Sequence, residues 1–188
     1  TSIPSAVGMN KELAKKKFSE AGLRVPRGIS VSRGEEVGDV VERIKAVVSA
    51  PYVVKPMAGG SSIGLSLAHN DRELVFAIEN ALAHAEKAII EEYVRGREIT
   101  VGVIDAVSGT TAYATPPLEI LLPEGTLFDY DQKYKNLSHP VGPARLHDHE
   151  RCALEQAALT AHSHLGARHY ARYDFILTDE GPCILEVN

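Results

Sequence analysis

The spacing of apolar residues in the first half of the chain predicts three helices and two short strands. Helical spacing or a helix start signal is found at residues 10–22, at 34–49 and from Asn70 onward. Asn70 is expected to cap its helix, because Glu73 follows at the spacing of a capping box. Strands are expected at 28–32 and 52–55, on either side of the second helix.

The second half of the chain is mainly strand-like and rich in Val, Ile, Tyr and Thr. The strand-like segments are residues 87–94, 97–105, 111–122, 169–177 and 183–187. One long helix is expected at 148–166, with Gly166 at its end. The pattern therefore predicts an α+β fold of two lobes, residues 1–94 and residues 95–188, which meet near residues 91–96.

A polar segment at 124–147 lies between the strands and the long helix and is too long for a tight turn. Loops of that length in compact proteins often serve as lids over a ligand. The segment contains Lys133 beside aromatic residues, and a lid lysine would cover an anionic ligand and exclude water. An acidic surface loop is the alternative, and it is the commoner use of such sequence.

Composition and charge exclude several classes of protein. The formal net charge is −5, whereas nucleic-acid-binding proteins carry clustered positive charge, so no nucleic-acid partner is expected. No apolar run approaches the roughly 20 residues needed to cross a bilayer, and no secretory signal pattern is present. The two cysteines, Cys152 and Cys183, are interpreted as reduced thiols. We expect a cytoplasmic protein that does not contact a membrane.

Lys55 and the glycine-rich segment 56–64 form the first candidate for ligand chemistry. Glycines let backbone N–H groups close on phosphate oxygens, while Ser61 and Ser62 add hydroxyl donors and Lys55 adds a positive charge. The segment matches neither a Walker A loop nor a dinucleotide-binding fingerprint. A flexible hairpin is the alternative, but the Lys-Pro at the end of a strand favours phosphate binding.

Acidic residues follow an apolar pair where the two lobes are expected to meet. Two isoleucines lead to Glu91 and Glu92, and Glu98 follows a short distance along the chain. A flat base could bond to the backbone here, with one carboxylate on its amino group and another on ribose hydroxyls. A solvated charged turn is an equally good interpretation of this segment alone.

Arg172, Asp174, Glu186 and Asn188 form a further candidate, on two strand-like segments joined by a short turn. A hairpin would bring Asp174 near Glu186 and Asn188. Alternation along a strand puts Arg172 and Asp174 on one face, and likewise Glu186 and Asn188. Three oxygen ligands suit Mg²⁺ bound to ATP phosphates, and Arg172 would offer a planar fork to a phosphoryl group or carboxylate. The alternative is an ordinary hairpin with a polar outer face.

Taken in order, these segments resemble the ATP-grasp superfamily and, within it, the D-alanine–D-alanine ligases. The resemblance covers nearly the whole chain, and its specific parts are the Gly-Gly-Ser-Ser loop at 59–62 and the lid at 129–134. It implies an ATP-grasp fold, in which two α+β lobes with antiparallel sheets clasp the nucleotide. It also implies an ATP-dependent ligase that joins two D-alanines through an acyl phosphate, for peptidoglycan precursor synthesis.

The resemblance implies a role for each candidate residue. Catalytic roles fall to Arg172, Lys133, Ser61 and Tyr134. The residues implied in ATP binding are Lys11, Lys55, Gly60, Ser61, Ser62, Glu91, Glu92, Val94, Glu98 and Lys133. Glu91 would face the adenine amino group and Glu98 the ribose. Asp174, Glu186 and Asn188 would hold magnesium, with two ions expected and Mn²⁺ as a possible substitute.

The implied partners are D-alanine and ATP, and a homodimer is expected for the full-length protein. The family's N-terminal domain and its Thr-x-Pro-Gly continuation after Asn188 have no counterpart in the chain, which is therefore expected to be an excerpt. Two alternatives remain open. One is an ATP-grasp ligase with other amino or carboxylic acid substrates, and the other is a nucleotide-binding module without full activity.

Overall fold

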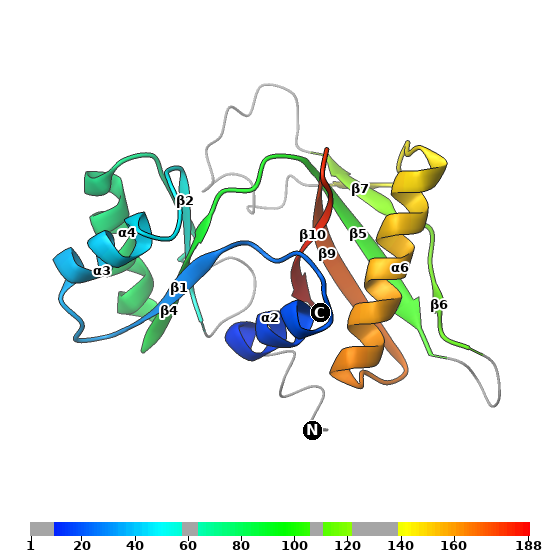
Figure 1. Cartoon of the computed structure of the whole chain (residues 1–188), viewed down its shortest axis with the longest axis horizontal. Helices are drawn as coiled ribbons and strands as arrows, with labels where there is room; N and C mark the ends of the chain where they lie inside the picture. Colours follow the sequence, from blue (N-terminus) through cyan, green and yellow to red (C-terminus); the bar gives the residue numbers. More distant parts are fainter. Residues whose placement is uncertain (1–9, 58–63, 106–110, 122–138) are drawn as a thin grey trace. The chain divides into compact units, whose positions relative to one another are not determined.

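The chain folds into two compact units, each built on an antiparallel sheet (Figure 1). The computed structural model describes residues 10–57, 64–105, 111–121 and 139–188. Within that part, unit 1 holds the residues up to Val25, those from Val94 to Leu121 and those from His139 onward. Unit 2 holds the described residues from Pro26 to Tyr93.

Unit 2 is a four-stranded sheet in the order β1-β4-β2-β3, with two helices packed on it. Its strands are β1 (Gly28–Ser32), β2 (Tyr52–Pro56), β3 (Ser66–Ala68) and β4 (Lys87–Glu92). Its helices are α3 (Val37–Lys45) and α4 (Asp71–His84). Both helices bury apolar side chains in one core with the strands, among them Ile44, Leu74 and Ile78, which are fully buried. This burial is the main source of stability for a sheet of short strands.

Helix α4 begins at the predicted cap. The Asn70 side chain accepts a hydrogen bond from the Glu73 backbone N–H at 3.0 Å. The Glu73 carboxylate reaches back to the His69 backbone N–H at 2.8 Å, one residue earlier than in a standard capping box. These bonds satisfy backbone donors at the helix start that have no intrahelical partner.

Unit 1 is a six-stranded sheet in the order β10-β9-β5-β7-β8, with β6 also paired to β5. Its strands are β5 (Arg97–Ile104), β6 (Tyr113–Ala114), β7 (Leu118–Leu121), β8 (His139–Val141), β9 (Tyr170–Thr178) and β10 (Gly181–Val187). Its helices are α2 (Lys11–Glu20) and α6 (Asp148–Leu165). Helix α6 ends at Gly166, as predicted, with that glycine in the left-handed conformation at φ 63°.

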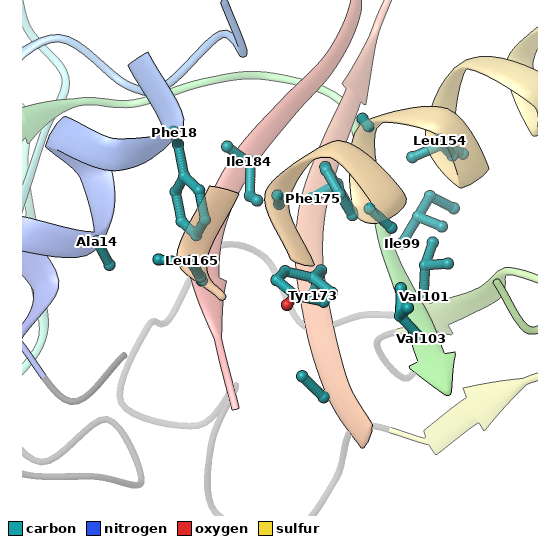
Figure 2. Packing of buried hydrophobic residues seen from close by; sticks show 14 of the residues in the cluster. Ala14, Phe18, Ile99, Val101, Val103, Leu154, Leu165, Tyr173, Phe175 and Ile184 are labelled. Carbon is teal, nitrogen blue, oxygen red and sulfur yellow. The ribbon is translucent and has the colours of Figure 1, made fainter. Parts of the chain in front are cut away.

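The core of unit 1 lies between these helices and one face of the sheet (Figure 2). Phe18 of α2 and Leu154 of α6 are fully buried there, against Tyr173 and Phe175 of β9. On β5 the core residues are Ile99, Val101 and Val103. Because side chains alternate along a strand, the residues between them belong to the opposite face of the sheet.

Several elements differ from the prediction. The strand expected at 111–122 is divided into β6 and β7, because Pro116 and Pro117 lack the N–H groups that a continuous ladder needs. The helix expected at 34–49 spans Val37–Lys45 only. Helix α2, which the sequence grouped with the first lobe, packs in unit 1, because Phe18 is buried in that core. The change of unit between Tyr93 and Val94 lies beside the expected lobe boundary.

The described helices are all short or polar by the standard of a membrane span. None of those in the described part of the chain combines the length and hydropathy needed to span a bilayer.

Candidate functional site

The face of the unit 1 sheet that points away from the core is polar at its centre. Asp174 of β9 lies directly opposite Thr100 of β5 on one side and Glu186 of β10 on the other. Arg172 and Asn188 are also opposite each other, joined by two backbone hydrogen bonds of 2.8 Å. Residues directly opposite in an antiparallel pair point to the same face. The hairpin therefore gathers the four predicted residues beside Thr100.

Hydrogen bonds fix the Asp174 carboxylate, whose side chain is 15% exposed. Its Oδ1 accepts from the Thr100 hydroxyl at 2.6 Å and from Arg172 Nε at 3.1 Å. Its Oδ2 accepts from Arg172 Nη2 at 3.2 Å and from the Asn188 amide Nδ2 at 2.8 Å. A partly buried carboxylate is costly without such partners, and here one of the partners is a cation.

A β-bulge in β10 brings Glu186 and Asn188 to this face. Ile184 opposes Phe175 and lies in the core, whereas Glu186 opposes Asp174, and Leu185 between them has no partner in the register. Strict alternation from Ile184 would have turned Glu186 toward the core. The extra residue changes the parity of the strand, so the polar residues join Asp174 instead.

The chemistry of these side chains fits a hard divalent cation. Asp174, Glu186 and Asn188 supply oxygen atoms, which are the ligands that Mg²⁺ prefers. The Asn188 amide directs its nitrogen at Asp174, so its oxygen is the atom left to bind a cation. Among the described residues, this face included, no group of three or more His, Cys, Asp and Glu side chains is placed to hold a metal ion, and the third oxygen here comes from an amide.

The arginine beside Asp174 bears directly on this fit. The Arg172 side chain is 57% exposed and places its guanidinium against both Asp174 oxygens. The guanidinium therefore neutralises the negative charge of Asp174, as a bound metal ion would. A metal ion on Asp174 would compete with Arg172 for the same oxygens, and the exposure of Arg172 leaves its side chain room to turn away.

In unit 2, Lys55 and Glu91 form a buried ion pair. The Lys55 Nζ lies 3.0 Å from Glu91 Oε2, and the two side chains are only 12% and 3% exposed. Gly28 on β1 is opposite Glu91, and a Cβ there would lie 2.1 Å from the Ile90 carbonyl oxygen. A side chain larger than hydrogen at residue 28 would therefore push the strand that carries Glu91 out of place.

Glu92, next along β4, has a different partner. Arg27 donates to Glu92 Oε2 from Nη2 at 2.8 Å and from Nε at 3.1 Å, and its backbone N–H donates to Oε1 at 3.0 Å. The Glu92 N–H in turn donates to the Arg27 carbonyl at 2.9 Å. In the structure, the Glu92 carboxylate is bound to Arg27. Its role in ATP binding stays a prediction.

The other predicted ATP-binding residues lie in several parts of the chain. Lys11 is the first residue of α2, and Val94 and Glu98 belong to unit 1, with Glu98 two positions before Thr100 on the same face of β5. Five predicted site residues lie outside the described residues: Gly60, Ser61, Ser62, Lys133 and Tyr134.

The sequence did not single out Thr100, Arg27 or the bulge at Leu185. Thr100 could have been found from alternation, since it is a polar residue between Ile99 and Val101 in an apolar strand. Arg27 and the bulge could not, because a cross-strand pair and a change of register depend on how strands align in space.

Behind the polar face, a polar contact is buried in the core of unit 1. His162 of α6 is 3% exposed, and its Nδ1 lies 3.0 Å from the Tyr173 hydroxyl. Its Nε2 has no hydrogen-bond partner among the described residues and lies 3.8 Å from Asp105 Oδ1. Burial lowers the pKa of His162 and raises the pKa of Tyr173. The strand that carries Asp174 on one face is therefore anchored to α6 by a neutral histidine on the other.

Known proteins are similar to this chain over most of its length. The family model described as "D-ala D-ala ligase C-terminus" matches residues 18–188. A D-alanine–D-alanine ligase of Halalkalibacterium halodurans is 36% identical over 187 residues, which cover 98% of this chain and 59% of that protein. The chain thus spans somewhat more than half the length of the relative it matches.

Two solved structures share the fold over 99% of this chain. The VanG D-Ala:D-Ser ligase from Enterococcus faecalis aligns with a TM-score of 0.87 and 32% identity, over 53% of its own length. The D-alanine–D-alanine ligase from Bacillus anthracis aligns with a TM-score of 0.80 and 28% identity, over 58% of its length. The predicted ATP-grasp fold is confirmed, and the chain belongs to the D-alanine–D-alanine ligase family as its C-terminal, ATP-grasp part.

Proposed function

We propose that the full-length protein, meaning this chain with any residues that flank it, joins two D-alanines at the expense of ATP. The observation that carries the ATP-dependent part of the proposal is the gathering of Asp174, Glu186 and Asn188 on the polar face of unit 1. Family membership supports it, since the matched relative is a D-alanine–D-alanine ligase. The product would serve peptidoglycan precursor synthesis in the cytoplasm, and the protein would act as a homodimer.

The proposed reaction has two steps. The carboxylate of the first D-alanine attacks the γ-phosphorus of ATP, the bond to the bridging oxygen breaks, and ADP leaves. The amine of the second D-alanine then attacks the acyl carbon, loses a proton and displaces inorganic phosphate. Neither step needs a nucleophilic side chain, so the protein contributes position and charge.

Charged side chains of the chain have complementary roles in this scheme. Lys11 and Lys55 would lie along the ATP phosphates, and Lys133 would cover the γ-phosphoryl group with Ser61 and its neighbours Gly60 and Ser62. Arg172 would stabilise oxygen charge in the acyl phosphate and in the tetrahedral intermediate. Tyr134 would order the D-alanine site.

The nucleoside end of ATP would be held by the acidic segment. Glu91 is proposed to face the adenine amino group and Glu98 the ribose, with Glu92 and the backbone at Val94 completing the site. The Lys55–Glu91 ion pair supports this assignment, because the lysine proposed for the phosphates and the carboxylate proposed for the adenine lie 3.0 Å apart in unit 2.

Asp174, Glu186 and Asn188 would hold Mg²⁺, with two ions expected and Mn²⁺ as a possible substitute. When bound, the metal would neutralise phosphate charge that the lysines leave uncompensated. These three residues would present oxygen atoms on one face of the sheet. The hydrogen bonds that Thr100 and Asn188 donate to Asp174 hold its carboxylate in place.

A second candidate differs in the second substrate. The VanG structure is named as a D-Ala:D-Ser ligase, and its TM-score of 0.87 and 32% identity exceed the 0.80 and 28% of the Bacillus anthracis D-alanine–D-alanine ligase. A protein that joins D-alanine to D-serine is therefore the leading alternative. The residues proposed for ATP and metal would have the same role in both cases, so they do not distinguish the two substrates.

Product analysis tests the proposal. The full-length protein is incubated with ATP, Mg²⁺ and D-alanine, alone or with D-serine, and the dipeptides are identified by mass spectrometry. We expect D-alanyl-D-alanine from D-alanine alone, with one ADP released for each dipeptide. Predominant D-alanyl-D-serine would favour the second candidate.

A third outcome would support the interpretation of the protein as a nucleotide-binding module. In that case ATP would bind, but ADP release would not depend on D-alanine. L-alanine serves as a control, because it offers the same groups with the wrong configuration and should release little ADP.

A further inference from the structure

The Thr100 hydroxyl is the least exposed of the side-chain donors around the Asp174 carboxylate. The Thr100 residue is 8% exposed, whereas the Arg172 side chain is 57% exposed and Asn188 is an exposed residue. The Thr100–Asp174 hydrogen bond of 2.6 Å is also the shortest of the four that reach this carboxylate from described residues.

The backbone fixes the direction of this hydroxyl. Thr100 is on β5, which is paired on both sides, with β9 along one edge and with β6 and β7 along the other. Threonine is branched at Cβ and has few χ1 choices in a strand, so its hydroxyl is directed by the sheet itself. The cross-strand register then places Asp174 directly opposite it.

The other donors have a reason to move that Thr100 does not have. Arg172 is a cation that would compete with a metal ion for the Asp174 oxygens, and Asn188 is itself a proposed ligand. Thr100 touches Oδ1 alone and carries no charge. Its bond can therefore persist when Arg172 leaves, and it would keep the carboxylate plane from rotating.

We propose that Thr100 is a positioning residue for the metal site: it holds Asp174 Oδ1 so that the carboxylate keeps one orientation whether or not the metal is bound. The inference rests on the proposed function, because it presumes that Asp174 is a metal ligand. Partners that orient a ligand from behind commonly contribute 10- to 100-fold to metal affinity.

The test compares variants of the full-length protein by their metal dependence in binding ADP. Thr100→Val has nearly the same shape but no hydroxyl, and Thr100→Ser restores the donor. Thr115→Val is the matched control, because the Thr115 hydroxyl accepts from the Gly102 N–H in the same unit without touching Asp174. Asp174→Asn removes the proposed ligand charge itself.

The measured quantity is the ratio of the ADP Kd without Mg²⁺ to the ADP Kd with Mg²⁺, from titration calorimetry. Direct Mn²⁺ binding, followed by electron paramagnetic resonance, is the second readout. We expect Thr100→Val to lower the ratio and the Mn²⁺ affinity about 10- to 100-fold. Thr100→Ser and Thr115→Val should stay within about threefold of the parent, and Asp174→Asn should abolish the metal dependence.

Each other outcome overturns the inference in a distinguishable way. A parent-like ratio in Thr100→Val, with loss in Asp174→Asn, removes the role of Thr100 and leaves the proposed metal site intact. Equal losses in Thr100→Val and Thr115→Val would show a general effect on the sheet. A parent-like ratio in Asp174→Asn would overturn both the inference and the metal site. Circular dichroism checks folding, and Thr100→Ala replaces Thr100→Val if the valine variant does not fold.

Discussion

At the scale of single residues, the β9–β10 hairpin of unit 1 contains two glutamates with different surroundings, Glu186 and Glu180. Asp174 is surrounded by donors, and Glu186 lies opposite it on the next strand. In the same hairpin, Glu180 lies in an ion pair with Arg24, at 2.9 Å between Oε2 and Nη1. Two glutamates six positions apart therefore offer a direct comparison between a proposed metal ligand and a surface ion pair.

Glu186→Gln is expected to lose most of the Mg²⁺-dependent part of nucleotide binding. The amide keeps the size of the side chain but removes the negative charge that a divalent cation requires. Titration calorimetry with ADP, with and without Mg²⁺, measures this part. Glu180→Gln should bind like the parent, because that side chain is 79% exposed and its partner is a surface arginine. A loss of the same size in the absence of metal would contradict a metal role for Glu186.

The buried His162 predicts a stability that depends on pH. Burial lowers the pKa of this histidine in the folded state, so the unfolded chain binds the proton more readily. The contribution of His162 to the free energy of unfolding should therefore be fully present above about pH 6.5, the pKa of an unfolded histidine. It should be lost progressively as the pH falls below that value. Chemical unfolding of the parent at several pH values between 5 and 8 measures this slope.

A substitution assigns the slope to the histidine. His162→Gln cannot take up a proton, so its stability should change less between pH 7 and pH 5 than that of the parent. His164→Gln is the control, since His164 is exposed and its Nδ1 lies 3.0 Å from the Thr160 carbonyl oxygen. The explanation would be wrong if the two variants showed the same slope as the parent.

At the scale of elements, two glycines with different backbone conformations lie at the end of one helix and within another. Gly166 ends α6 with φ at 63°, a region that costs about 1 kcal/mol or more for a residue with a Cβ. Gly38 lies within α3, where a Cβ would meet no atom within 4 Å. The same change should therefore have opposite signs at the two positions.

Gly166→Ala is expected to destabilise the protein by about 1 kcal/mol, and Gly38→Ala to stabilise it by about 0.5–1 kcal/mol. The second effect arises because alanine loses less conformational freedom than glycine when a helix forms. Urea unfolding measures both. Equal destabilisation by the two variants would show that the left-handed geometry at Gly166 has no influence.

The sequence predicted the elements well where one local signal decided them. Asn70 and Gly166 marked helix ends because capping and left-handed geometry depend on a few neighbouring residues. The strand expected at 111–122 was too long, because apolar content outweighed the two prolines at its centre. β8 was not predicted, since its residues pair with distant β7 and have little pattern of their own.

The candidate site was predicted as a set of residues but not as a set of contacts. The hairpin spacing indicated that Asp174, Glu186 and Asn188 would be close, and the register places them so. The bond from Arg172 to Asp174 was not foreseen, because Arg172 was assigned to a substrate group. Nor was the Arg27–Glu92 bond, which joins residues 65 positions apart.

At the scale of the whole molecule, the proposal also depends on a lid lysine in a different segment of the chain from the metal ligands. Lys133 lies outside the described residues, and its assignment rests on the resemblance of 129–134 to the family lid. Lys133→Ala is expected to lower kcat by 100-fold or more, in the range of other groups that stabilise transition-state charge. Binding of ADP should change much less, because ADP lacks the γ-phosphoryl group.

Lys135 provides the matched control for this prediction. It is two positions away in the same segment, so Lys135→Ala removes a similar positive charge. Steady-state kinetics and ADP titration of both variants decide the matter. Equal losses of turnover and ADP affinity in Lys133→Ala would contradict a role confined to the transferring group.

The bulge at Leu185 determines which side chains at the end of β10 point to the outer face of the sheet. With the extra residue, the outer face of the strand presents Glu186 and Asn188 while Val187 packs against the core. A chain one residue shorter at this point would present the apolar set and bury a carboxylate. Length is thus a stricter requirement here than side-chain identity. A functional relative should tolerate many residues in place of Leu185, but neither an insertion nor a deletion beside it.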